Sequence, residues 1–393
     1  MADHQALEGV VGRNLVVRGC HMDMRTAQGV IREDLQYICT NLREEFACLA
    51  GKELLITGGA GFLGYYLVQS VLRWNRSTHD APGIRLTVYD NYIRGVPAWL
   101  TKLEGDENLV LVKHDMTHPL PENMGDFQYI VHAASIASPT YYRMHPIETM
   151  DANVNGLRFL LEYARQQKEK GKPVEGFLFF SSSEIYGDPR PEDIPTPETC
   201  RGSVSCTGPR ACYDESKRYG ETLCVNFARH YSLPIKIARP FNNYGPGLKI
   251  TDGRVLPDFA RDVLAGKDII MLSDGSPTRT FCYVADAIIG YYKLLVRGRN
   301  GEAYNIGVEE PEISIADLAE RVVELARDLV DYRGKVVRQA SSDLHYLVDN
   351  PNRRCPMIAK ARADLGYNPS IPLGEGLRRS LIWYRDNRDG EEA

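Results

Sequence analysis

The stretch ITGGAGFLG, residues 56–64, constrains the fold of this chain more than any other part of it. Gly58, Gly61 and Gly64 are spaced three apart, directly after the strand-like run 53–57 and at the start of a helical pattern. Glycines at such a turn let backbone N–H groups and the start of the helix approach a pyrophosphate. A glycine triplet alone is a weak signal, because ordinary strand-to-helix turns also contain glycine. The strand before it and the helix after it predict a dinucleotide-binding unit.

Short apolar runs alternate with helical patterns after this motif. The runs span residues 85–90, 109–115, 129–135, 176–183 and 235–241. Helical patterns at 145–168 and 213–231 lie between them. This alternation is typical of a parallel sheet with helices on both faces. We therefore predict an α/β fold: a Rossmann-type doubly wound parallel sheet with a smaller C-terminal substrate-binding region.

The pattern divides the chain into three regions. Residues 1–50 precede the first strand and are predicted as an N-terminal helical extension, because apolar residues recur there at helical spacing. Those residues are Ile31, Leu35, Ile38, Leu42, Phe46 and Leu49. Residues 51–241 are predicted to form mainly the dinucleotide-binding Rossmann domain. Residues 242–393 are predicted to form mainly the substrate-binding region, with some strands returning to the Rossmann sheet.

Composition argues against several classes of function. The 393 residues carry a formal net charge of -5, so no excess of lysine and arginine exists to bind a nucleic-acid backbone. The nine cysteines are odd in number and contain no CxxC spacing, so neither a disulfide framework nor a zinc site is predicted. The first residues, MADHQALEGVVGRN, show no basic start followed by an apolar core, so no secretion leader is expected, and no apolar run approaches bilayer-spanning length. We expect a soluble cytoplasmic protein with no metal and no nucleic-acid or membrane partner.

A carboxylate ends the second predicted strand. Asp90 can accept hydrogen bonds from an adenosine ribose there and would repel a 2'-phosphate, so NAD is favoured over NADP. Arg94, close behind it, weakens that preference. The alternative for Asp90 is a solvated turn residue. Asp115 closes the third predicted strand, where it either faces the adenine or is an ordinary loop residue.

Tyr213 and Lys217 stand four residues apart in a helical pattern, which places both side chains on one face. A tyrosine is a poor base at neutral pH, but a lysine ammonium one turn away and an oxidised nicotinamide ring would favour the phenolate. Tyr213 would then remove a hydroxyl proton while hydride leaves for NAD. The same spacing also occurs by chance in exposed helices, and the nucleotide motif favours the catalytic interpretation.

Polar residues end the apolar run 176–183. Ser182 and Ser183 can hydrogen-bond a sugar hydroxyl at the carboxyl edge of the sheet, or they can cap a turn. Glu184 follows them and is a candidate acid, base or hydrogen-bond partner. The predicted cofactor-binding residues are Gly58, Gly61, Phe62, Leu63, Gly64, Asp90, Asn91, Arg94, Asp115, Met116, Ala133, Tyr213 and Lys217.

Four motifs carry a resemblance to a known family. They are SSSEIYGDP, GPRACYDESKR, DGRVLPDFARDVLAG and TRTFCYVAD. From Lys52 to about Asp389 the chain resembles the extended short-chain dehydrogenase/reductases that act on nucleotide sugars, and within them the UDP-glucuronate decarboxylases, or UDP-xylose synthases. The resemblance is specific, because most of these motifs lie outside the cofactor unit that the whole superfamily shares.

The resemblance implies that Tyr213 deprotonates the sugar 4-hydroxyl while hydride passes from carbon 4 to a tightly held NAD. Dehydratases of this superfamily typically carry Asp-Glu where this chain has Ser183 and Glu184, and simple 4-epimerases usually have no glutamate there. A decarboxylase needs no leaving-group acid, because a 4-keto uronic acid loses carbon dioxide to an enolate. The implied reaction converts UDP-glucuronate to UDP-xylose by oxidation at carbon 4, loss of carbon dioxide and re-reduction.

The substrate site is also implied by the resemblance. Arg279 matches an arginine that reaches the substrate near its carboxylate, for which a planar guanidinium is suited; it completes the predicted catalytic set. The other matches lie around the nucleotide diphosphate and uridine, or in the loop between nicotinamide and sugar: Asn242, Arg254 and Arg354, and Ser135 and Ser138. The alternative for the first three is turn capping or surface pairing.

The helices at 145–168 and 213–231 match those of a four-helix dimer interface, so a homodimer is expected. The chain departs from the family pattern at His145, where asparagine is common, and at Met357, where aspartate is common. Two other functions remain open. One is a 4-epimerase or 4,6-dehydratase acting on a different nucleotide sugar, and the other is a non-catalytic NAD-binding scaffold.

Overall fold

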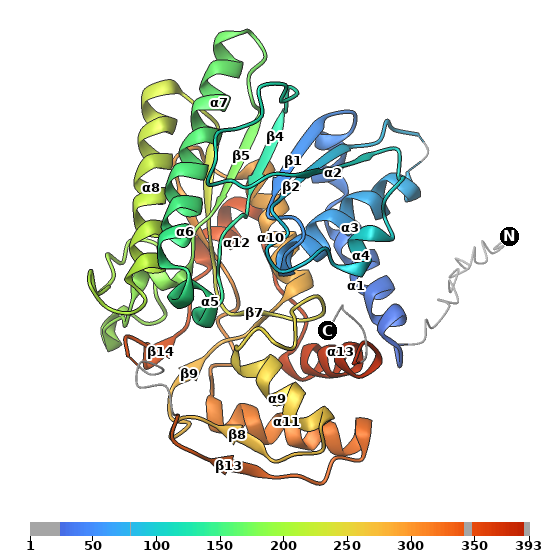
Figure 1. Ribbon diagram of the computed structural model, residues 1–393, viewed down its shortest axis with the longest axis vertical. Helices are drawn as coiled ribbons and strands as arrows, with labels where there is room; N and C mark the ends of the chain where they lie inside the picture. Colours follow the sequence, from blue (N-terminus) through green and yellow to red (C-terminus); the bar gives the residue numbers. More distant parts are fainter. Residues whose placement is uncertain (1–23, 79, 342–347, 389–393) are drawn as a thin grey trace, which may run out of the picture.

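A computed structural model describes residues 24–78, 80–341 and 348–388 of the chain. At its centre is a seven-stranded sheet in the order β11-β6-β5-β4-β1-β2-β3, with every neighbouring pair parallel (Figure 1). The strands are β1 (Glu53–Thr57), β2 (Arg85–Asp90), β3 (Leu109–Lys113), β4 (Tyr129–His132), β5 (Gly176–Phe180), β6 (Ile235–Pro240) and β11 (Ala303–Ile306). The predicted Rossmann-type fold class is confirmed.

The predicted strands differ from the observed ones mainly at their carboxyl ends. β1 and β2 match their predicted bounds, whereas β3 stops at Lys113, β4 at His132 and β5 at Phe180. In each case the apolar run continues into polar or small residues that leave the sheet. These residues form the loops at the carboxyl edge, which is where parallel sheets bind ligands.

Helices cover both faces of the sheet (Figure 1). On one face, α3 (Phe62–Ser77) and α10 (Val284–Arg297) share a buried apolar cluster with Leu54 and Ile56 of β1. On the opposite face, helices α7 (Leu157–Glu169) and α8 (Ala211–Tyr231) share a second cluster with Leu55. Successive residues of a strand point to opposite faces, so a strand buried on both faces is apolar throughout.

The helix predicted at 145–168 is interrupted. α5 (Pro139–Met144) precedes it, and α6 (Pro146–Asp151) begins at a proline. A proline disfavours helical backbone angles in the residue before it, so α5 and α6 are separate helices. A π-helical turn, Ala152–Gly156, then leads into α7 (Leu157–Glu169). A Cβ atom at Gly156 would lie 2.7 Å from the carbonyl oxygen of Met116, so glycine lets the helix pass close to the loop after β3.

The other predicted helix, 213–231, begins two residues earlier than predicted. It is α8 (Ala211–Tyr231), which packs beside α6 and α7. The 3₁₀ turn that follows β5 packs against α8, so Ser182, Ser183 and Glu184 lie near Tyr213 and Lys217 along one cavity.

Residues 24–50 of the predicted N-terminal extension contain two helices, α1 (Ala27–Asn41) and α2 (Arg43–Leu49), while residues 1–23 lie outside the described part. The expected apolar stripe is buried, with Ile38 and Phe46 both fully inaccessible. α1 packs against α3, α10 and α13 (Leu373–Asp386). The extension therefore covers the body of the protein.

A buried carboxylate anchors α1. Asp34 accepts hydrogen bonds from the hydroxyls of Tyr66 and Tyr283, both at 2.6 Å, and forms an ion pair with Arg379 of α13. Burial raises the pKa of Asp34, although Arg379 and the two tyrosines act in the opposite direction. These contacts join four separate segments of the chain.

The smaller region lies at the bottom of Figure 1. Its elements are α9 (Val255–Leu264), α11 (Ile315–Val330), β8 (Ile269–Met271), β13 (Val336–Arg338), β9 (Thr278–Arg279), β12 (Ile313–Ser314) and β14 (Arg353–Arg354). β7 (Asn243–Tyr244) and β10 (Cys282–Tyr283) connect it to the main sheet. The chain returns to that sheet through α10 and β11, and α12 (Ala359–Leu365) packs on both. No helix within the described ranges combines the length and apolar character of a membrane span.

Candidate active site

A cavity of about 700 Å³ lies along the carboxyl edge of the sheet. Every site residue predicted from the sequence lines this cavity. They are Gly58, Gly61, Phe62, Leu63, Gly64, Asp90, Asn91, Arg94, Asp115, Met116, Ala133, Ser135, Ser138, Ser182, Ser183, Glu184, Tyr213, Lys217, Asn242, Arg254, Arg279 and Arg354. Segments separated by almost 300 residues in the sequence therefore contribute to one site.

The glycine loop forms the cofactor side of the cavity. Gly58 has a positive φ of 75°, and a Cβ atom there would lie 2.6 Å from Cα of Ala134, so only glycine fits. A Cβ atom at Gly64 would lie 2.1 Å from the carbonyl oxygen of Gly59. α3 begins after Gly61 with no side-chain cap from the described residues, which leaves its first N–H groups for an anionic ligand. This arrangement fits the pyrophosphate of a dinucleotide.

Asp90 lies beside the glycine loop and is not a solvated turn residue. Its carboxylate accepts hydrogen bonds from the backbone N–H groups of Ala60 at 3.0 Å and Tyr92 at 2.8 Å. Burial raises its pKa. Asp115 accepts a hydrogen bond from the amide of Asn91 at 3.0 Å, which joins the loops after β2 and β3. The carboxylates therefore shape the cofactor side and line the cavity.

Tyr213 and Lys217 are buried rather than exposed, with 6% and 2% of their surface accessible. The Tyr213 ring stacks on Tyr142 with 5.1 Å between the centroids. Lys217 donates a hydrogen bond to the carbonyl of Phe180 at 2.8 Å, and its ammonium lies 5.6 Å from the centre of the Tyr213 ring. The alternative interpretation, an exposed pair whose spacing arose by chance, is wrong because both side chains are buried.

The pKa values of the pair differ from the simple expectation. Burial raises the pKa of Tyr213 to about 12, although Ser182 and Arg254 act to lower it. Burial lowers the pKa of Lys217 to about 7. Because Lys217 bonds to a backbone carbonyl, its position does not by itself produce a phenolate; Tyr213 needs further positive charge beside it to act as a base.

The serines after β5 have both a structural and a site-facing role. Ser182 caps a 3₁₀ turn, Ser183–Tyr186, by accepting a hydrogen bond from the N–H of Glu184 at 3.2 Å. The capping alternative is therefore realised, while Ser182 and Ser183 also line the cavity. The turn directs Glu184 toward the arginines that follow.

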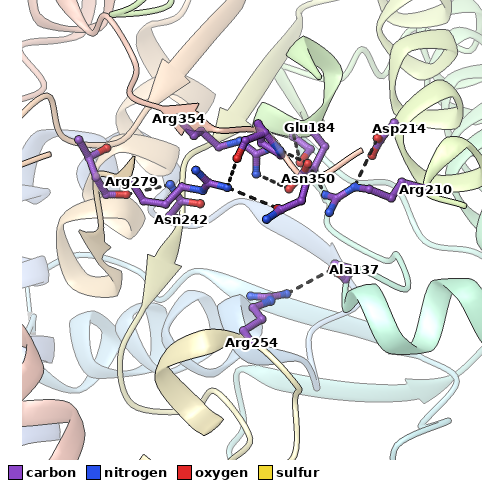
Figure 2. A network of polar contacts seen from close by, with 12 residues as sticks. Ala137, Glu184, Arg210, Asp214, Asn242, Arg254, Arg279, Asn350 and Arg354 are labelled. Atoms are coloured by element: carbon purple, nitrogen blue, oxygen red, sulfur yellow. Dashed lines mark hydrogen bonds and ion pairs between the residues drawn. The ribbon is translucent and has the colours of Figure 1, made fainter. Parts of the chain in front are cut away.

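Glu184 is held between two arginines, as Figure 2 shows. Arg210 and Arg354 both form ion pairs with its carboxylate. Burial by itself would raise the pKa of Glu184, but the two arginines together lower it to about 2. The side chain is therefore ionised at neutral pH and carries no proton to donate. Of its three predicted roles, a pKa of about 2 disfavours both the acid and the base, and it favours a hydrogen-bond or ion-pair partner.

Arg279 is a buried cation near this cluster (Figure 2). It donates hydrogen bonds to the carbonyls of Thr278 at 2.7 Å and Asn352 at 3.1 Å. None of the carboxylates in the described ranges forms an ion pair with it. Burial and the neighbouring Arg354 lower its pKa to about 9, so it stays protonated at neutral pH. An anionic ligand would supply the missing negative charge.

The remaining predicted substrate residues differ in how free their polar groups are. The Asn242 amide donates to the carbonyl of Thr280 at 2.8 Å, and the Ser138 hydroxyl donates to the carbonyl of Asp252 at 2.7 Å. Arg254 forms an ion pair with Asp252 at 3.0 Å. The Ser135 hydroxyl is buried and has no partner among the described residues, so it is available to a ligand.

Sequence reasoning missed Arg210 and Asp214. Both lie in the motif GPRACYDESKR, on either side of Tyr213. Asp214 is close to Arg210, with 3.8 Å between its carboxylate and the guanidinium, and burial together with Glu184 raises its pKa to about 7. Charged residues flanking Tyr213 in this motif were the available signal. Of the two departures from the family pattern, His145 lines the cavity and Met357 does not. No cluster of three or more metal-ligating side chains occurs in the described part of the chain.

Comparison with known proteins identifies clear relatives. Residues 54–307 match the model of the NAD dependent epimerase/dehydratase family. The chain is 36% identical over 336 residues to UDP-glucuronic acid decarboxylase 3 of Arabidopsis thaliana, which covers 86% of this chain and 90% of that protein. It is 35% identical over 334 residues to UDP-glucuronic acid decarboxylase 1 of Xenopus tropicalis, which covers 85% of this chain and 72% of that protein.

A solved structure extends this likeness to three dimensions. The dTDP-glucose 4,6-dehydratase DesIV of Streptomyces venezuelae, solved with NAD bound, has a TM-score of 0.73 and 26% sequence identity, covering 86% of this chain and 98% of that chain. The likeness therefore spans both the sheet and the smaller region.

Proposed function

This chain belongs to the NAD dependent epimerase/dehydratase family, and from that premise we propose that it is a nucleotide-sugar decarboxylase that converts UDP-glucuronate to UDP-xylose. The reaction oxidises carbon 4 of the sugar, releases carbon dioxide and reduces the 4-keto intermediate. Two decarboxylase relatives at 35% and 36% identity support this substrate.

The observation that carries the proposal is the group of three arginines at Glu184. Arg210 and Arg354 pair with its carboxylate, and Arg279 lies close by with no ion pair to a carboxylate of the described residues. A uronic acid brings a carboxylate that fits Arg279, because guanidinium groups bind carboxylates in a planar, bidentate way. A neutral hexose with a 6-hydroxyl brings no such charge to carbon 6.

Bound NAD supplies the hydride acceptor on its nicotinamide ring. Tyr213 takes the proton of the sugar 4-hydroxyl. Because burial raises the pKa of Tyr213, this step depends on positive charge beside the phenol group. Arg279 and Arg354 hold the substrate carboxylate and stabilise the negative charge that develops when carbon dioxide leaves. Glu184 stays ionised and positions the arginines. Ser182 and Ser183 contact the sugar hydroxyls.

Proton NMR of the protein with UDP-glucuronate and NAD tests this proposal. We expect loss of the carbon 5 substituent and the appearance of UDP-xylose or its 4-keto precursor. The matched control is Tyr213→Phe, which removes one oxygen and should lower the rate by at least about 100-fold. Formation of UDP-galacturonate would identify a 4-epimerase instead, and unchanged UDP-glucuronate would mean that the substrate assignment is wrong.

The other candidate functions are less well supported. A 4,6-dehydratase requires an acid for the leaving 6-hydroxyl, and Ser183 stands at the position where relatives of that class carry aspartate. A non-catalytic NAD-binding scaffold has no need of Ser182, Glu184, Tyr213 and Lys217 around one cavity. Absorbance at 340 nm after addition of UDP-glucuronate separates the scaffold from both enzymes, because a scaffold leaves NAD oxidised.

We also propose that the protein is a homodimer that pairs through α6 and α8. Large apolar side chains are exposed on these helices, with Ile147 at 60%, Met150 at 37% and Tyr219 at 49% accessibility. Burial of such side chains favours association. Light scattering should give twice the monomer mass, and Ile147→Glu should shift it to the monomer; a wild-type monomer would contradict the proposal.

Two further assignments complete the proposal. We assign residues 242–393 mainly to substrate binding, because Asn242, Arg254, Arg279 and Arg354 come from this part of the chain. We place the protein in the cytoplasm, because an odd number of cysteines without CxxC spacing suits a reducing compartment.

A further inference from the structure

An ion pair joins the two sides of the cavity. Arg94, in the loop after β2, contacts Asp252, which lies just before α9, with 3.0 Å between the guanidinium and the carboxylate. The Asp252 side chain is only 4% exposed, whereas that of Arg94 is 33% exposed. Both residues line the cavity, Arg94 on the side of the glycine loop and Asp252 on the side of the smaller region. The pair therefore spans the space between the two predicted ligand sites.

Neighbouring contacts hold the same loops together. The Arg94 guanidinium lies over the ring of Tyr141 at 4.6 Å from its centroid. Lys249 donates a hydrogen bond to the carbonyl of Arg94 at 2.9 Å, and Ser138 donates one to the carbonyl of Asp252 at 2.7 Å. The loops 91–97, 137–141 and 247–254 are thus cross-linked by polar groups, so one loop cannot swing away without disrupting the others.

Asp252 is shared between two arginines. Its second carboxylate oxygen contacts Arg254 at 3.0 Å, and Arg254 also donates to the carbonyl of Ala137 at 3.4 Å (Figure 2). Arg254 is one of the three residues expected to contact the nucleotide diphosphate or uridine. A single buried carboxylate therefore connects an arginine on the cofactor side to an arginine on the substrate side.

This geometry argues against Arg94 as a reader of a 2'-phosphate. Its guanidinium is already paired with Asp252 and packed on Tyr141. Separating Arg94 from Asp252 leaves a buried carboxylate with less positive charge, which is costly. That cost rises when a diphosphate binds Arg254, because Arg254 then gives part of its charge to the ligand and Asp252 depends more on Arg94.

We propose that Arg94, Asp252 and Arg254 form a bridge that couples the two ligand sites, so that a nucleotide diphosphate bound at Arg254 slows the release of the dinucleotide. The coupling rests on the proposed function only in taking Arg254 as the diphosphate ligand. It suits a reaction whose hydride leaves the sugar and returns to it, because the reduced cofactor must stay bound between the two transfers. By linkage, the factor by which the diphosphate tightens equilibrium binding of the dinucleotide is also the factor by which the dinucleotide tightens diphosphate binding.

The test measures release of NADH, followed by its fluorescence after mixing with excess NAD, in the presence and absence of UDP. In the wild type we expect UDP to slow release by roughly tenfold, a typical size for coupling between two sites. Arg94→Ala should speed release and reduce the effect of UDP to about twofold or less. Asp252→Asn should behave in the same way, and Arg94→Lys, which keeps the charge, should retain part of the coupling.

The control is Arg76→Ala, which removes an exposed ion pair to Asp106 away from the cavity and should leave the UDP effect unchanged. The proposal is overturned if UDP does not slow release in the wild type, or if Arg94→Ala retains the full UDP effect. Should Asp252→Asn fail to fold, the partly exposed Arg94 still decides the question. Neither probe is turned over, so failure of UDP-glucuronate decarboxylation would leave this result standing, and the reverse also holds.

Discussion

Asp34 and Glu184 are both buried carboxylates paired with arginine, yet their surroundings differ. Asp34, in the contact between α1 and α13, has one arginine partner and two tyrosine hydroxyls. Glu184, at the end of β5, has two arginine partners and a third arginine, Arg279, nearby. Burial prevails at Asp34 and raises its pKa, whereas the arginines prevail at Glu184 and lower its pKa to about 2.

Asp34 therefore belongs to a contact that stabilises the fold, whereas Glu184 belongs to a site that is suited to binding a ligand. Around Asp34 the charges balance and neutral donors satisfy the remaining lone pairs, which is what a buried ion pair needs to be tolerated. Around Glu184 three arginines lie close together, and Arg279 has no ion pair among the described residues, so it is repelled by Arg354 and Arg210. Such an arrangement is suited to a negatively charged substrate.

The largest expected effect comes from replacing one of the arginines that pair with Glu184. Arg354→Met keeps most of the side-chain volume and leaves Arg210 on Glu184. We expect kcat/KM for UDP-glucuronate to fall by about 1,000-fold, because the developing negative charge loses a fixed donor. The free energy of unfolding should change by less than about 1 kcal/mol, because Glu184 keeps its ion pair with Arg210. A large loss of stability with normal turnover would reverse the comparison.

The same substitution in the other cluster should have the opposite effect. Arg379→Met removes the cation of Asp34 and should lower the free energy of unfolding by about 3 kcal/mol, because a buried carboxylate is left unpaired. Turnover per folded molecule should stay near the wild-type value. Urea titration measures the first quantity and active-site titration the second. Arg333→Met, at an ion pair that is 84% exposed on the arginine side, is the control and should change neither.

A third test changes the charge state of Glu184. Its pKa of about 2 keeps it ionised from pH 4 to pH 8 in the wild type. Arg210→Gln removes one of the two arginines, so the pKa should rise and the acid limb of the pH–rate profile should move upward. We expect a further loss of activity of roughly tenfold at pH 5 relative to pH 8, because a carboxyl group whose pKa lies one unit above the pH is mostly protonated. An unchanged profile would show that Glu184 ionisation does not limit the rate.

The smallest predicted effect concerns Asp34. A carboxyl whose pKa is higher in the folded state favours folding at low pH, and this contribution is lost as the pH rises through the folded value. The destabilisation in Arg379→Met should therefore shrink by about 1 kcal/mol between pH 7 and pH 5, as Asp34 takes up a proton. Urea titrations at both pH values measure this difference. Growth of the destabilisation at pH 5 would contradict the assigned direction.

Local patterns were sufficient for much of the fold and site. β1 and β2 have their predicted bounds, because an apolar run followed by glycine or a carboxylate is a short-range signal. Tyr213 and Lys217, which were selected by their spacing and by the motif around them, both line the cavity. These features depend on neighbours in the sequence, which is where pattern reasoning is strongest.

The missed features depend on distant partners. Arg210 is 26 residues from Glu184, and Arg94 is 158 residues from Asp252. Nothing within either segment marks the residue that meets it across the cavity. The π-helical turn at 152–156 was missed for a related reason, since it depends on the close approach of Gly156 to the loop containing Met116.

The contact between α1 and α13 also affects the order in which the protein is assembled. Asp34 and Arg379 are separated by 345 residues, and Ala27 donates a backbone hydrogen bond to Asp386 at 2.7 Å. During synthesis the ribosome releases α1 long before it has made α13. α1 can therefore pack on α3, through Tyr66, before its arginine has been made, and the contact with α13 can form only after α13 is translated.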